Sequence, residues 1–141
     1  MKDLLEYSVD KVAHVLEEHR QLVLNVTEAV NQALAVPEAE REQVVTGIRD
    51  LLNSLMGARE GLLKSGSEYV KIVRCCLRRD ESLEALFSYY VMAGHKMEQE
   101  AVKRAGGLIE IMDDLNHIRD TTSSLQQVLI EVSGLRGQAS R

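Results

Sequence analysis

The sequence predicts an all-α protein, an elongated antiparallel three-helix bundle or coiled coil with long helices. Apolar residues recur at alternating steps of four and three along most of the chain, the heptad pattern of helices that pack side by side. Aromatic residues make up only 4% of the 141 residues, and there is a single proline, so little favours strands or interrupts helices. A compact four- or five-helix bundle is the alternative, because two glycine-containing stretches offer further breaks.

The first helix is predicted over about residues 2–36. Pro37 ends it, because proline lacks an amide hydrogen and restricts the residue before it. Glu38 and Glu40 then suit the start of a second helix, where negative charge is favourable. The apolar seam of the first helix consists of Leu5, Val9, Val12, Leu16, His19, Val23, Val26, Val30 and Ala33.

The second helix is predicted over about residues 38–78. Its apolar surface is broader than a two-stranded seam needs, so we expect it at the centre of the bundle, in contact with two other helices. Cys76 falls in its seam and is expected in the core as a reduced thiol. A bridge to the adjacent Cys75 would be strained, because neighbouring helical side chains point about 100° apart.

The third helix is predicted over about residues 81–134, followed by a frayed tail over 135–141. Its seam passes 106–107 without a change of register, so we expect at most a kink there, as at 65–67. At about 1.5 Å per residue, the three helices would be roughly 50, 60 and 80 Å long.

The third helix should therefore extend beyond the other two and leave part of its seam uncovered. An uncovered apolar seam is normally an interface, so dimerisation or a partner helix is expected there. The predicted interaction residues are Leu108, Ile111, Leu115, Ile118, Leu125, Leu129 and Val132.

Four seam positions are not ordinary core residues: His19 in the first helix, and Gly94, Arg104 and Thr122 in the third. His19 and Arg104 would have to be paired if buried, and we predict that they specify the register or the partner. With an ordinary pKa near 6.5, His19 would also make assembly sensitive to pH. The alternative for Arg104 is a side chain that extends into solvent. Gly94 marks a local kink or a close approach of another backbone.

A cluster of basic residues follows the outer face of the second helix. It is either an anionic site for lipid or nucleic acid or a solvated helix face partly neutralised by nearby acidic residues, and we favour the second. The candidate basic patch consists of Lys71, Arg74, Arg78 and Arg79.

The chain as a whole is read as a single helical bundle domain over residues 1–141. Its net charge of −5 argues against nucleic acid or an anionic membrane as the main partner. No apolar run approaches the roughly 20 residues of a membrane span, and the first residues do not look like a signal peptide. We expect a cytoplasmic protein.

The sequence offers little chemistry. Few residues lie outside the predicted helices, no phosphate-binding loop or nucleophile elbow is present, and the cysteines lack zinc spacing. His95 and Glu98 are three residues apart, but they fall outside or beside the seam and are interpreted as a solvated pair rather than metal ligands. We expect no enzyme, no catalytic residue, no metal and no cofactor.

These observations favour a non-enzymatic adaptor or assembly subunit that binds proteins through helix–helix contacts, as a homodimer or with a partner helix. One alternative is a cytosolic secretion or flagellar export chaperone that holds its partner along an apolar helical face. Another is a membrane-curvature dimer of long helices, which would need a basic concave face that the net charge disfavours.

Overall fold

The computed structural model describes residues 3–76 and 78–139, with side chains up to residue 134. All regular structure in this part of the chain is helical, so the predicted all-α helical bundle is confirmed. The elements are α1 (Leu4–Ala35), the 3-10 turn η1 (Glu38–Glu40), α2 (Arg41–Cys76), α3 (Glu81–Tyr89), the π-helical η2 (Tyr90–Gly94), α4 (His95–Ala105) and α5 (Met112–Ala139). The segments α3, η2 and α4 follow one another without a break and form one rod.

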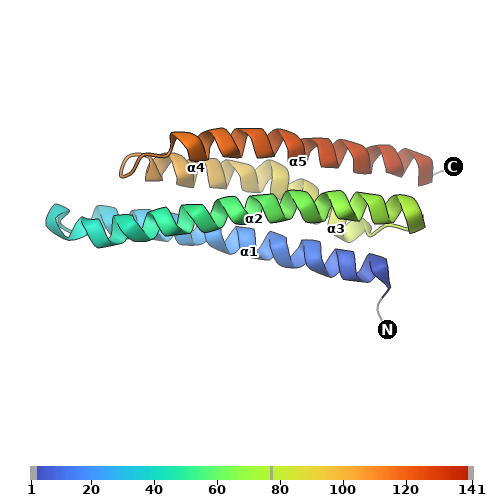
Figure 1. The fold of residues 1–141 in the computed structure, drawn as a ribbon, viewed down its shortest axis with the longest axis horizontal. Helices are drawn as coiled ribbons and strands as arrows, with labels where there is room; N and C mark the ends of the chain where they lie inside the picture. The colour runs from blue at the N-terminus through green and yellow to red at the C-terminus, as the bar shows by residue number, and fades with distance from the viewer. Residues whose placement is uncertain (1–2, 77, 140–141) are drawn as a thin grey trace.

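The rods lie side by side along one long axis (Figure 1). α1 packs against α2, which runs in the opposite direction, and α5 packs on α2 while α4 packs on α1. The α2–α3 connection lies at one end of the bundle. The α1–α2 and α4–α5 connections lie at the other end, where the tip formed by α1 and α2 extends beyond the α4–α5 turn.

The single helix predicted over 81–134 is wrong, because the chain turns back between α4 and α5. The amide of Gly106 donates to the carbonyls of Val102 and Lys103 at 3.0 and 3.1 Å, and this tight turn ends α4. A β-carbon on Gly106 would lie only 2.8 Å from Cδ1 of Ile111, so glycine lets Ile111 fold back onto the turn. The chain therefore forms the more compact bundle held as the alternative.

The other predicted weak point, 65–67, does not interrupt the chain, and α2 is continuous through it. Gly66 is buried there, with the ring of Phe87 only 3.2 Å from the position that its β-carbon would take. The missing side chain thus allows α3 to lie close to α2 rather than bending α2.

Two helices, α1 and α3, begin at an aspartate that caps the first turn. Asp3 accepts a hydrogen bond from the amide of Glu6 at 2.9 Å and caps α1. Asp80 accepts from the amide of Leu83 at 2.8 Å and caps α3, in agreement with the turn predicted at 79–81. Such caps satisfy amides that have no partner within the helix.

The core consists of two apolar clusters that follow one another along the bundle axis. The cluster near the α2–α3 connection contains Leu5, Val12, Leu16, Leu62, Tyr69, Val70, Val73, Leu83, Phe87, Val91, Leu125 and Val128. The cluster near the two turns contains Val23, Val26, Val30, Ala33, Ile48, Leu52, Leu55, Ala101, Val102, Ala105, Ile111 and Ile118.

The core position predicted for Cys76 is wrong. Cys75 and Cys76 are both free thiols and both exposed. α2 ends at Cys76, and Val73 is the last buried residue of that helix. The heptad pattern therefore continues one turn beyond the part of α2 that the other helices cover.

The α2–α3 connection depends on one buried hydroxyl. Tyr69 Oη accepts from the amide of Asp80 at 2.9 Å and lies 2.7 Å from Glu84 Oε2. Burial and the Glu84 carboxylate raise the pKa of Tyr69, which keeps the hydroxyl protonated. Arg79 pairs with the other oxygen of Glu84.

We expect Tyr69→Phe to lower the free energy of unfolding by about 1–2 kcal/mol, because the amide of Asp80 and the carboxylate of Glu84 each lose a partner. Urea unfolding followed by circular dichroism measures this loss. Tyr7→Phe is the matched control, since Tyr7 is exposed and its hydroxyl has no hydrogen bond in the described part of the chain. Equal stability of the two variants would contradict this role for the Tyr69 hydroxyl.

Candidate functional site

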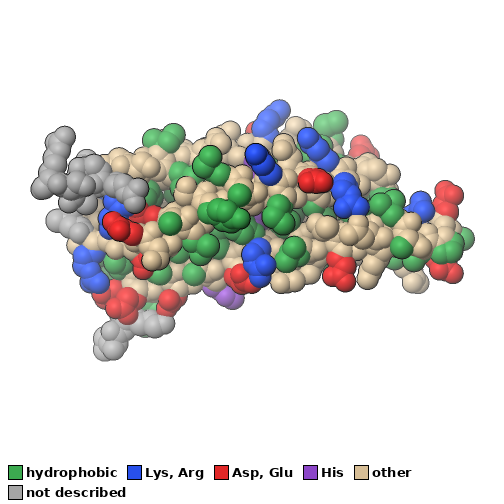
Figure 2. Space-filling model, turned by 180° about the vertical axis from the view of Figure 1, so that it is seen from behind, with side chains coloured by type: hydrophobic (Ala, Val, Ile, Leu, Met, Phe, Trp, Pro, Cys, Tyr) green, Lys and Arg blue, Asp and Glu red, His purple; other side chains and the backbone are tan. Residues whose placement is uncertain are grey.

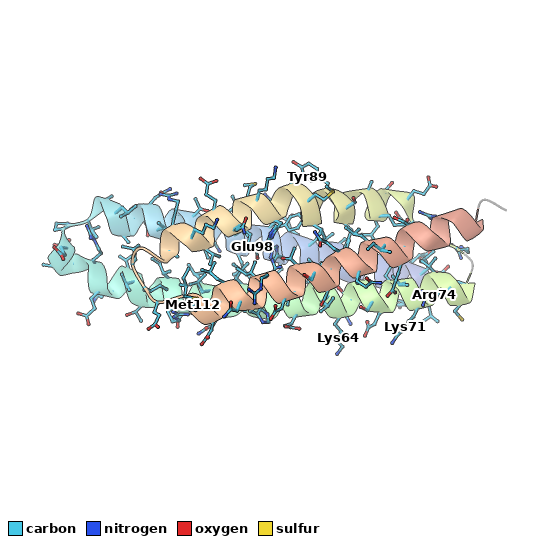
Figure 3. The ribbon with its side chains drawn as sticks, turned by 90° about the horizontal axis from the view of Figure 1, so that it is seen from above. Lys64, Lys71, Arg74, Tyr89, Glu98 and Met112 are labelled. Carbon is cyan, nitrogen blue, oxygen red and sulfur yellow. The ribbon has the colours of Figure 1, made fainter. Side chains whose placement is uncertain are left out.

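A layer of polar side chains crosses the middle of the bundle between the two apolar clusters. His19 of α1 and Arg59 of α2 are each 2% exposed, and Glu98 of α4 is 0% exposed. Thr121 and Thr122 complete the layer from α5. Figure 3 shows Glu98 directed from α4 into the bundle. All four rods thus contribute to one set of contacts.

Glu98 is the acceptor at the centre of the layer. Its Oε2 lies 2.6 Å from Nε2 of His19, and its Oε1 accepts from the guanidinium of Arg59. Nδ1 of His95 lies 3.9 Å from the same Oε1. The carboxylate therefore balances the charge of Arg59 in the buried interior of the bundle.

Arg59 donates to α5 as well as to α4. Its Nε donates to Thr121 Oγ1 at 2.7 Å, and one terminal nitrogen donates to Thr122 Oγ1 at 2.5 Å and to the carbonyl of Ile118 at 3.0 Å. Burial lowers the pKa of Arg59 to about 10, so the guanidinium stays charged at neutral pH. A buried charge needs this complete set of partners.

The hydrogen bonds of His19 fit the neutral ring. Tyr90 Oη lies 3.1 Å from Nδ1 and can donate to it, while Nε2–H donates to Glu98. Burial, with a smaller contribution from the positive charge of Arg59, lowers the pKa of His19 to about 3. The folded state therefore disfavours the charged ring near neutral pH, and the sensitivity of assembly to pH stays a prediction. His19 is buried and paired, and its role in setting register stays a prediction.

The burial of Arg59 and Glu98 was not predicted from the sequence. The π-helical segment η2 explains why Glu98 is buried. A π turn accommodates one extra residue, so the buried face of α4 shifts by up to one residue relative to the heptad pattern. The predicted seam position Met97 is consequently 57% exposed, and its neighbour Glu98 faces the core. The feature of the sequence that could have indicated this shift is Gly94, which ends η2 and interrupts the apolar seam.

The same shift displaces Arg104 from the core. Ala105 is fully buried in its place, and Arg104 is exposed and donates to Asn31 Oδ1 at 2.6 Å. The prediction that Arg104 is a buried register residue is therefore wrong. The solvent-directed side chain held as the alternative is what the structure has.

The prediction of an uncovered seam at the end of the chain is also wrong. α5 folds back on α2, so the predicted interaction residues contribute to the two apolar clusters. A charge at Leu125, which is 3% exposed, would disrupt the fold itself. Three of the predicted interaction residues are buried: Ile111, Ile118 and Leu125. The other four are partly buried: Leu108, Leu115, Leu129 and Val132.

The candidate basic patch does not form a continuous cationic surface. Lys71 and Arg74 point outward from α2 in Figure 3, and Lys71 is exposed. The three arginines bind carboxylates instead: Arg74 with Glu131 at 3.8 Å, Arg78 with Asp3 at 2.8 Å, and Arg79 with Glu84. This arrangement fits the solvated helix face better than an anion site.

Large apolar side chains are exposed on the outside of the rod formed by α3, η2 and α4. Leu86, Tyr89, Met92 and Met97 are 47%, 68%, 69% and 57% exposed, and we call them the outer apolar face. Figure 2 shows hydrophobic side chains gathered over the middle of this side of the molecule. Tyr89 points away from the bundle in Figure 3.

A groove of about 430 Å³ between α3 and α5 adjoins this face. Tyr89 belongs to both, and Leu129 and Val132 line the groove from α5. These two residues are the part of the predicted interaction seam that still borders an open surface. The outer apolar face and the groove together form the candidate docking surface.

The space beside the polar layer is far smaller, about 10 Å³, enough for a single water molecule. Within the described residues, no three histidine, cysteine or acidic side chains are arranged to hold a metal ion, and no helix could cross a membrane. Comparisons of the chain with protein-family models, curated proteins and solved structures gave no match.

Proposed function

We propose that this protein is a non-enzymatic adaptor or assembly subunit that binds another protein through the outer apolar face. The observation that carries the proposal is the exposure of Tyr89, Met92 and Met97 on one rod, each by more than half. Single exposed apolar residues are common on protein surfaces, but a row of large ones on one element usually marks a binding surface.

The residue types support this use of the surface. Methionine is flexible and polarisable and adapts to the shape of a partner. Tyrosine offers a large contact area with few rotatable bonds, and both types are enriched in interfaces. The groove beside Tyr89 could receive a side chain of the partner, with Leu129 and Val132 as its apolar lining.

The rod that carries the outer apolar face is held firmly from behind. Tyr90 and Glu98, on the inner side of the same rod, are hydrogen-bonded to His19 of α1. Glu98 is also bound by Arg59 of α2. A surface fixed in this way loses little conformational entropy on binding, which favours affinity.

The proposal is tested by site-specific photocrosslinking of the full chain in the organism that encodes it. Benzoylphenylalanine at position 89 should give an adduct of one defined mass. The same amino acid at position 112 is the control, because Met112 is 65% exposed but lies at the start of α5, away from the face (Figure 3). No adduct at position 89, or equal adducts at both positions, would contradict the proposal.

A further inference from the structure

We infer that the protein bound by the outer apolar face is a second copy of this chain, docked antiparallel about a twofold axis near Met92. This inference rests on the proposed function of that face and adds the identity of the partner. The pattern of charged and apolar residues along α3, η2 and α4 carries it.

The charges at the two ends of the rod are opposite. Glu81 begins α3 and Lys103 lies in the last turn of α4, eleven positions on either side of Met92. Both side chains are exposed, and neither forms an ion pair within the described part of the chain. An antiparallel second copy would bring Glu81 of each chain to Lys103 of the other, whereas a parallel copy would place like charges together.

The apolar residues follow the same symmetry. Leu86 and Met97 lie six and five positions on either side of Met92, so each would contact the other across the interface. Met92 would contact Met92 of the second copy at the axis. An interface that is complementary to itself closes after two copies and gives a dimer rather than a filament.

The residues close to Met92 add a further favourable contact between the two copies. Tyr89 and the exposed Lys96 lie three and four positions from Met92, which would place an ammonium group near an aromatic ring. The exposed Glu100 lies eight positions from Met92, opposite Glu84, whose carboxylate is buried and already paired with Tyr69 and Arg79. The exposed residues nearest Met92 are therefore compatible with this docking.

The size of the face indicates a weak, reversible dimer. From 81 to 105 the rod is about 37 Å long and about 10 Å wide, a footprint of roughly 400 Å² per copy. Stable interfaces bury about 800 Å² per partner, so we expect a dissociation constant in the micromolar range or above. Dimerisation should thus be visible only at high concentration.

Sedimentation equilibrium of the full chain, from about 10 to about 500 μM, tests the inference. The unmodified chain should shift from monomer to dimer over this range. Glu81→Lys and Lys103→Glu should each weaken the dimer roughly tenfold, because two attractions become repulsions. The double variant Glu81→Lys/Lys103→Glu should restore it, since the opposite charges meet again.

Asp50→Lys is the matched control, because Asp50 is exposed on α2, which packs mainly on α1 and α5, and its reversal should leave the dimer unchanged. Circular dichroism checks that all variants stay folded. A chain that stays monomeric to the highest concentration, or a dimer that ignores the single reversals or is not restored by the double one, overturns the inference. In those cases an adduct at position 89 with a different protein would still support the proposed function, whereas an adduct of twice the chain's mass supports both.

Discussion

Glu98→Gln is expected to lower the free energy of unfolding by about 3–5 kcal/mol, a large effect for a substitution that hardly changes side-chain size. Glu98 supplies the only carboxylate that contacts both Arg59 and His19 in the described structure. Without its charge, the guanidinium of Arg59 is left buried and uncompensated. Chemical denaturation followed by circular dichroism at neutral pH measures the loss.

The matched control is Arg59→Met/Glu98→Gln, which removes both charges of the pair. Its amide oxygen can still accept from Nε2–H of His19, and the methionine fills much of the space of the arginine stem. Replacing a buried ion pair with neutral groups is often nearly neutral for stability, so the double variant should recover most of the loss. If Glu98→Gln alone costs less than about 1 kcal/mol, water reaches the layer and Arg59 is not desolvated as described.

Acid is expected to destabilise the bundle strongly through His19. The pKa of His19 is about 3 in the folded state and about 6.5 when unfolded, so the unfolded chain binds the proton more readily. The stability is fully present above pH 6.5 and falls by about 1.4 kcal/mol per pH unit as the pH drops towards 3. Burial also lowers the pKa of His95, which adds in the same direction.

The variant His19→Gln isolates this contribution. A glutamine amide can donate to Glu98 and accept from Tyr90, but it does not titrate. Its stability at neutral pH should be somewhat lower, whereas its loss between about pH 6 and pH 4 should be smaller than that of the unmodified chain by about 2–3 kcal/mol. Parallel pH dependences of the two proteins would show that His19 is already protonated, as an ion pair with Glu98, in the folded state.

The fold class followed from the sequence because heptad spacing and caps act locally. The α4–α5 turn did not, because Ile111 and Ile118 beyond it pack into the same cluster as Ala101 before it. A chain that folds back on its own core keeps the register of a continuous helix. Periodicity alone therefore could not separate one long helix from two shorter ones.

The polar layer could be predicted from the sequence only in part, and for a different reason. His19 stands in an undisturbed seam, so its burial could be predicted. Glu98 reaches the core only because the π-helical turn before it rotates α4. Arg59 lies beside Ala58 on the broad face of α2, and long arginines on such flanks usually reach solvent. Whether they turn inward depends on partners contributed by other helices.

The polar layer also determines how the bundle can open. The apolar cluster built on Phe87 and Leu125 is separate from the cluster built on Ile48 and Ile118, and the polar layer lies between them. Proteins open locally in contiguous cooperative units, and the layer divides the buried apolar residues into two such groups. We therefore expect the amide hydrogens of the two ends to exchange in separate openings, with the layer around Glu98 as the boundary between them, even though α1, α2 and α5 run through both ends.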